Sequence, residues 1–110
     1  MLPQFNPNLL KGVVAEYQHL TNNVQDHVEF MGYLGNCGFT APFDWMAWTE
    51  TVGDHWDSDT SLIDNADIDT LRKLVVAHQR IERTSEGHLE HLFDTGYMDK
   101  IFKRVEQLTP

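Results

Sequence analysis

The sequence contains a single cysteine, no long hydrophobic run and few basic residues, and each shortage excludes a class of protein. Cys37 has no second cysteine to pair with, so a disulfide framework is excluded and a cytoplasmic location is expected. No apolar run approaches the roughly 18 residues of a membrane-spanning helix, so we expect no membrane association. The first residues, MLPQFNPNLLKG, lack the basic and hydrophobic regions of a secretory signal.

Basic residues are scarce: 8 Lys and Arg accompany 17 Asp and Glu, giving a formal net charge of −9 at pH 7. Nucleic-acid affinity comes largely from Lys and Arg contacts to phosphates, so we expect no direct nucleic-acid binding. An acidic surface favours solubility or a basic protein partner. A related hypothesis is an acidic decoy that occupies the nucleic-acid site of a basic protein.

Stretches that alternate between apolar and polar residues are also short, which argues against a sheet. Instead, apolar residues recur at helical spacing of three and four in several segments. The 110 residues, of which 41% are hydrophobic, suffice for one core. We therefore predict an all-α fold, a compact bundle of four to five helices that forms a single domain over residues 1–110, with 1–7 as an N-terminal tail.

The first helical segment is predicted over residues 8–34, with Asn8 as its cap. Poor helix formers at 21–23 favour two helices rather than one. We expect the apolar stripe of this segment to be buried in a monomer, and a homodimer that forms through residues 8–34 is the alternative. The stripe consists of Leu10, Val13, Tyr17, Leu20, Val24, Val28, Met31 and Leu34.

A third helix is predicted after Pro42, with Trp45, Trp48 and Trp56 on one face. This face is either part of the core or a contact surface, because tryptophan is enriched at interface hot spots. Asp44, Trp45 and Trp48 are therefore binding candidates.

The acidic segment 57–69 is predicted to be a solvated loop, and Asp64 or Asp67 should cap the helix that follows it. In that helix the predicted buried positions include His78. The predicted solvent-facing side is basic and consists of Arg72, Lys73, Gln79, Arg80 and Arg83.

The corner after this helix gathers Arg80, Arg83, Glu86 and His88, and Ser85 is the predicted cap of the next helix. Stabilisation of helix ends by charges can account for these residues. Alternatively, they form a polar cluster whose arginines bind a small anion, such as a carboxylate or phosphate.

Two histidines, His88 and His91, stand three residues apart and are the candidates for metal binding. No HExxH motif or second histidine–acid pair accompanies them, so we predict no metal site. No GxSxG motif or glycine-rich phosphate loop occurs, and we expect no cofactor. The favoured function is a module that binds a protein or a small anion, and the alternative is a metal-dependent or acid–base enzyme that uses the His/Glu cluster.

The segments FDWMAW, ADIDTLRKL, RIERTSEGHLEHLFDTG and IFKRVEQL together resemble a family of small bacterial, archaeal and phage proteins, domain of unknown function 6508. The resemblance covers roughly Val28 to Leu108. It departs at Thr84, where the family tends to have an aromatic residue. The resemblance implies an all-helical single domain and no known activity. The matching positions are Phe43, Asp44, Trp45, Arg80, Arg83, Glu86, Gly87, His88, Leu89, Gly96 and Ile101.

Overall fold

Seven α-helices and one short 3₁₀ helix make up the fold in a computed structural model that describes residues 2–109. No strand occurs within these residues, so the all-α prediction is confirmed, whereas the predicted number of four to five helices is wrong. No helix in this part of the chain is long and apolar enough to cross a membrane. The elements are η1 (Pro7–Leu9), α1 (Leu10–Gln18), α2 (Val24–Asn36), α3 (Trp45–Val52), α4 (Ser61–Asp64), α5 (Ile68–Glu82), α6 (His88–Thr95) and α7 (Tyr97–Leu108).

Short elements account for the larger number of helices. The one-turn helix α4 lies within the segment that was predicted to be a loop, and it buries Ile63 in the core. Gly96 both ends α6 and begins α7, with a φ of 86° that side chains with a Cβ rarely adopt. Of the two predicted caps of α5, Asp64 and Asp67, it is Asp67 that caps the helix, by accepting a hydrogen bond from the Thr70 amide at 2.8 Å.

The N-terminal segment forms two helices, as predicted, because residues 19–23 interrupt it. Asn23 caps α2 by accepting a hydrogen bond from the Gln25 amide at 2.7 Å. The predicted cap at Asn8 is wrong. Asn6 accepts the amide hydrogen bond of Asn8 at 3.0 Å, and η1 then continues directly into α1.

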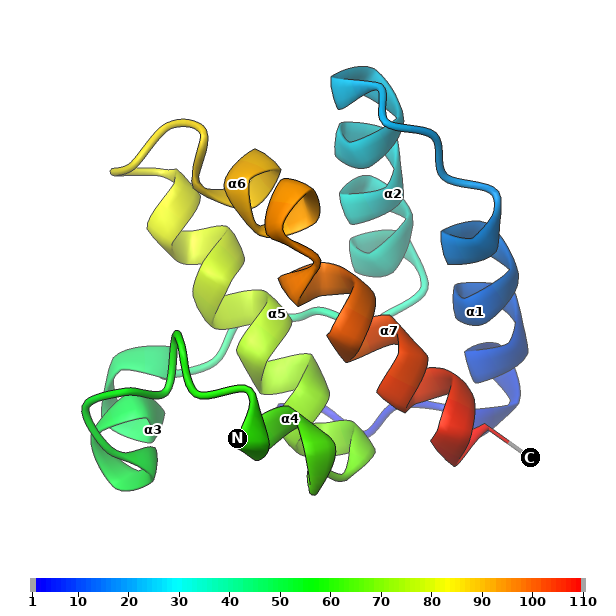
Figure 1. The fold of residues 1–110 in the computed structure, drawn as a ribbon. Helices are drawn as coiled ribbons and strands as arrows, with labels where there is room; N and C mark the ends of the chain where they lie inside the picture. The colour runs from blue at the N-terminus through cyan, green and yellow to red at the C-terminus, as the bar shows by residue number, and fades with distance from the viewer. Residues whose placement is uncertain (1, 110) are drawn as a thin grey trace.

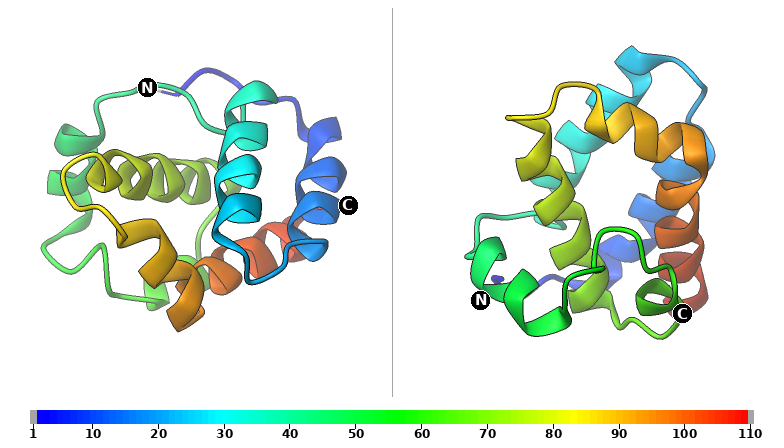
Figure 2. Two further views of the ribbon diagram at one scale, coloured as in Figure 1. Left: turned by 90° about the horizontal axis from the view of Figure 1, so that it is seen from above. Right: turned by 60° about the vertical axis from the view of Figure 1, so that its left-hand side comes forward.

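Helix α5 runs through the middle of the molecule, and both figures place the α1–α2 pair and α3 on opposite sides of it (Figures 1 and 2). The radius of gyration is 13.0 Å, the value expected for a folded chain of about 100 residues. One connected hydrophobic core draws on α1, α2, α5, α6 and α7. Its residues with 0% exposure are Val13, Leu34, Phe39, Leu71, Leu74, Val75, Met98, Ile101 and Val105.

The core-facing side of α2 differs from the predicted stripe. Val24 and Val28 are 57% and 59% exposed, although both were expected to be buried. His27 and Phe30 point inward instead, and the Phe30 ring meets that of Phe102 edge-on at 5.0 Å. The packing of α2 against α7 therefore leaves two valines on the surface.

Arg72 was predicted to face solvent, but its side chain is fully buried. The guanidinium donates hydrogen bonds to the carbonyls of Phe39 (2.8 Å), Pro3 (2.9 Å) and Gly38 (3.1 Å), and to Asp69 at 3.1 Å. Arg72 thus fastens the residues before η1 and the α2–α3 connection to α5. The prediction was wrong because the carbonyls that satisfy this charge lie more than 30 residues away in the sequence.

Candidate functional site

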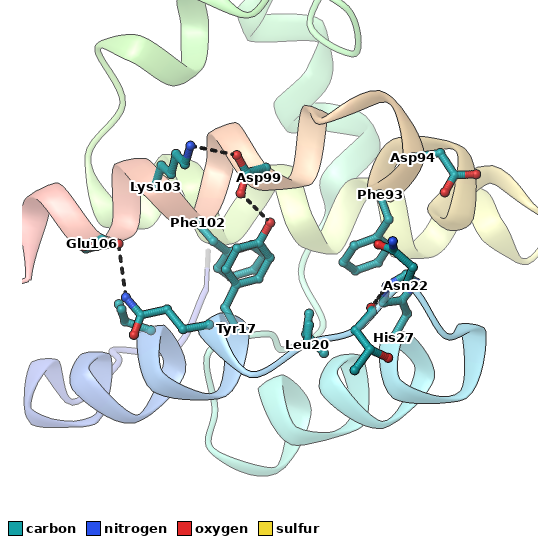
Figure 3. Close-up of a pocket in the computed structure, with 13 residues that line it drawn as sticks. Tyr17, Leu20, Asn22, His27, Phe93, Asp94, Asp99, Phe102, Lys103 and Glu106 are labelled. Atoms are coloured by element: carbon teal, nitrogen blue, oxygen red, sulfur yellow. Dashed lines mark hydrogen bonds and ion pairs between the residues drawn. The ribbon is translucent and has the colours of Figure 1, made fainter.

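A polar cavity of about 700 Å³ lies between the α1–α2 pair and helices α6 and α7 (Figure 3). Tyr17 reaches across it and donates a hydrogen bond to Asp99 Oδ1 at 2.9 Å. Lys103 forms an ion pair with the other oxygen of Asp99 at 3.2 Å. Burial, and next the hydrogen bond to Asp99, raise the pKa of Tyr17 well above its usual value, so Tyr17 stays a neutral donor.

His27 and Phe93 form the wall at one end of this cavity (Figure 3). Their rings stack with centroids 4.0 Å apart and an angle of 8° between the ring planes. His27 Nδ1 lies 2.7 Å from Glu90 Oε1, and Nε2 lies 2.9 Å from the Thr21 carbonyl oxygen. A carboxylate and a carbonyl both accept, so the two bonds form together only when both ring nitrogens carry hydrogen. The contact between His27 and Glu90 joins α2 to α6 through side chains.

A second, largely apolar groove of about 680 Å³ adjoins the same His27–Phe93 pair. It lies between α2, the C-terminal end of α5 and the start of α6. We call it the apolar groove. The exposed Val24 and Val28 line it from α2. Its other lining residues are His27, Met31, Gly32, Gln79, Glu82, Arg83, Glu86, Gly87, Leu89, Glu90 and Phe93.

A third, smaller groove of about 300 Å³ lies between α5 and the end of α2 with the segment that follows it. Arg80 lines it from α5, Arg83 lines it from the C-cap position just after α5, and Thr40 lines it from the α2–α3 connection. We call it the arginine groove. Gly35, Ala41, Pro42, Val76 and Gln79 complete its lining.

Comparison with known families shows where the chain belongs. The profile of a family described as "Family of unknown function (DUF6508)" matches residues 13–110. The chain belongs to this family. No curated protein and no solved structure matched the chain. The predicted family resemblance is therefore confirmed, and the match extends further than the stretch from Val28 to Leu108.

In this DUF6508 chain the predicted corner residues point in different directions. Arg80 and Arg83 line the arginine groove, and Arg83 and Glu86 line the apolar groove. His88 turns instead toward α5, where its Nε2 lies 2.9 Å from His78 Nδ1. The structure thus brings the two arginines to one groove and places His88 in the contact between α5 and α6.

Glu82, for which the sequence predicts no role, holds the start of α6. Its two carboxylate oxygens accept hydrogen bonds from the amides of Gly87 and Leu89, each at 2.9 Å. The predicted cap at Ser85 is wrong, because Gly87, with φ of 90°, occupies the cap position. Glu82, five residues before Gly87, was the sequence feature that could have indicated this cap. Whether its carboxylate reaches the amides of α6 depends, however, on the path of the turn between them.

Glu82→Ala is expected to lower the free energy of unfolding by about 1–2 kcal/mol, because two amides at the start of α6 lose their acceptor. Ser85→Ala is the matched control and should change stability by less than about 0.5 kcal/mol, as an exposed substitution does. Urea denaturation followed by circular dichroism measures both. Equal losses in the two variants would contradict the assignment of Glu82 as the cap.

The histidine pair that was considered for metal binding is separated in the DUF6508 fold. His88 contacts His78, whereas His91 is exposed on α6. His78 Nε2 also lies 2.9 Å from the Tyr97 hydroxyl oxygen, so both of its ring nitrogens have hydrogen-bond partners. Among residues 2–109 no group of three or more His, Cys, Asp or Glu is placed to hold a metal ion.

The tryptophan face is divided between α3 and the turn after it. Asp44 caps α3 by accepting a hydrogen bond from the Ala47 amide at 3.2 Å. Trp48 lies between Phe43 and Trp56, with ring centroids 6.2 and 6.3 Å apart. The predicted helix was too long, because α3 ends before Gly53 and leaves Trp56 in the turn that follows. There the Trp56 ring packs on His78, with the ring centroids 5.0 Å apart. Trp45 is half-buried.

Proposed function

We propose that this DUF6508 protein is a binding module whose apolar groove receives an amphipathic, basic segment of a partner protein. The observation that carries the proposal is the exposure of Val24 and Val28, at 57% and 59%, beside the apolar groove. An amphipathic helix binds in such grooves by inserting apolar side chains at helical spacing.

The two valines contribute little to α2 itself, which supports a role in binding. Valine has a lower helix propensity than residues such as alanine, leucine or glutamate, so an exposed valine does not favour the helix. Neither side chain is buried in the core, so neither gains much from the hydrophobic effect within the chain. With Met31, Leu89 and Phe93 they form an apolar surface that a partner can cover.

Charge around the apolar groove favours a basic partner. Glu82, Glu86 and Glu90 line the groove together with His27 and a single arginine, Arg83. The whole chain carries a formal net charge of −9. Complementary charge speeds association and disfavours wrong partners, and a second copy of this chain would bring the same negative charge. A basic segment therefore suits the groove better than a homodimer does.

A designed peptide tests this proposal without knowledge of the natural partner. An 18-residue amphipathic helix of leucine and lysine is expected to bind the parent, and fluorescence anisotropy measures the Kd. The double variant Val24→Ser with Val28→Ser should raise Kd about tenfold or more, because two apolar contacts are lost. Its stability should change little, since both side chains are exposed.

Two controls give the experiment its specificity. Met46→Ser removes another exposed apolar side chain, 64% exposed on α3, and should leave Kd unchanged. A peptide with the same composition in scrambled order should bind at least tenfold more weakly. Equal binding of both peptides, or equal Kd values for the double variant and the parent, would refute the proposal.

The predicted alternatives give different outcomes in the same samples. A homodimer through residues 8–34 would appear in sedimentation equilibrium of the protein alone, and loss of the dimer in the double variant would make a second copy the occupant of the groove. The decoy hypothesis predicts that the chain displaces duplex DNA from a basic DNA-binding protein and that the double variant does not.

A further inference from the structure

We propose that the arginine groove is a separate binding site for a small oxyanion, a carboxylate or a phosphate. The groove has a volume of about 300 Å³ and lies between α5 and the α2–α3 connection. Arg80, Arg83 and Thr40 supply its hydrogen-bond donors for an anion, and Gln79 adds an amide.

The four arginines of the chain divide into two kinds. Arg72 and Arg104 donate to backbone carbonyls, those of Phe39 and Ala66 among them. Arg80 and Arg83 make no side-chain hydrogen bond or ion pair with any other residue in the described range 2–109. They stand three residues apart at the C-terminal end of α5, where Arg83 is the C-cap and keeps a helical backbone, so they occupy neighbouring positions of one helix face. Two guanidinium groups with free donors suit the paired oxygens of a carboxylate or phosphate.

Thr40 provides an independent observation. Thr40 is only 7% exposed, and its hydroxyl has no hydrogen-bond partner among residues 2–109. Every fully enclosed side-chain oxygen or nitrogen among residues 2–109 has a hydrogen-bond partner. The Thr40 hydroxyl has none, so it is not fully enclosed, and it lies on the wall of the groove. A methyl group added at Gly35, which also lines the groove, would lie 3.7 Å from the Thr40 oxygen. Because this hydroxyl faces the groove and bonds no other residue, it is free to donate a hydrogen bond to an oxyanion bound there.

Stabilisation of the α5 C-terminus explains only part of this arrangement. Cations near the end of a helix interact favourably with its dipole, and Arg80 and Arg83 lie in that position. This effect requires neither a groove nor the unpartnered hydroxyl of Thr40. An oxyanion bound by both arginines and by Thr40 accounts for all three features together.

The arginine groove can be tested separately from the apolar groove. Arg83 lines both grooves, whereas Arg80 and Thr40 line only the arginine groove. Val24 and Val28 line only the apolar groove among the two. Variants at Arg80 and Thr40 therefore report on the anion site, and the valine double variant should keep full anion binding even if the proposed function fails.

Isothermal titration calorimetry and nuclear magnetic resonance test the site with sodium phosphate and sodium succinate, each at constant ionic strength. We expect saturable binding that shifts the Nε–Hε signals of Arg80 and Arg83 and leaves those of Arg72 and Arg104 unchanged. Arg80→Gln should raise Kd about tenfold, which is typical of the loss of one charged hydrogen-bonding group. The tighter of the two ligands shows whether the site takes a phosphate or a carboxylate.

Conservative variants separate binding from folding. Thr40→Val keeps the shape of the side chain but lacks the hydroxyl, and it should raise Kd severalfold. Thr40→Ser keeps the hydroxyl and should bind like the parent. Lys11→Gln removes an exposed cation of α1 and should leave Kd within twofold. Binding that does not saturate, or that Lys11→Gln weakens as much as Arg80→Gln does, would overturn the proposal.

Discussion

Arg72→Ala is expected to lower the free energy of unfolding by about 3–5 kcal/mol, a large share of the 5–15 kcal/mol that is usual for a folded domain. The substitution strands the carbonyls of Pro3, Gly38 and Phe39, all of which accept hydrogen bonds from this one guanidinium. It also removes the cation that lies 5.3 Å from the centre of the Phe5 ring. Urea denaturation followed by circular dichroism measures the loss.

Two further variants show whether the loss comes from this set of hydrogen bonds. Lys73→Ala removes a neighbouring cation that is not fully buried and should cost less than about 1 kcal/mol. Arg72→Lys keeps the charge but cannot reproduce the planar fork, so its stability should lie between those of Arg72→Ala and the parent. In both Arg72 variants residues 2–6 should become sensitive to proteases first. If Arg72→Lys matched the parent, the hydrogen bonds would not be the cause.

As the pH is lowered from 6.5 to 4, the free energy of unfolding of the parent is expected to fall by about 1.4 kcal/mol per pH unit because of His78. Burial, and next the neighbouring His88, lower the pKa of His78 from 6.5 to about 3. In that pH range the unfolded chain binds a proton at this position and the folded chain does not, so acid favours unfolding. Above about pH 7.5 this contribution no longer changes, because His78 is then almost entirely neutral in both states.

His78→Gln should flatten the dependence of unfolding free energy on pH between 4 and 6.5, whatever its effect on stability at neutral pH. The comparison is between slopes, so the lost hydrogen bonds to His88 and Tyr97 do not affect it. The lowered pKa of the α5 cap Asp67 acts in the same direction, but mainly below its usual value of 3.8. His19→Gln, at an exposed histidine, should keep the parent slope. An unchanged slope in His78→Gln would show that other groups control the acid response.

Only part of the candidate site could be predicted from the sequence. The two arginines of the arginine groove were singled out, because three-residue spacing on a helix predicts a shared face. Thr40 was missed, since nothing near it in the sequence indicates that its hydroxyl lies beside residues 80 and 83. Val24 and Val28 were predicted to be buried because the apolar spacing of α2 fits two adjacent faces.

Local patterns determined the helical class and the break between α1 and α2, and they limited the cap of α5 to Asp64 or Asp67. These features depend on hydrogen bonds and backbone preferences within a few residues, which the sequence displays directly. The tertiary structure alone decided that Arg72 is buried, that Glu82 rather than Ser85 holds α6, and that His88 meets His78 instead of joining the arginines. Each of these outcomes depends on how separate helices pack and on the path of the chain between them. Local spacing cannot specify which distant carbonyl or side chain will satisfy a buried polar group, and packing decides it.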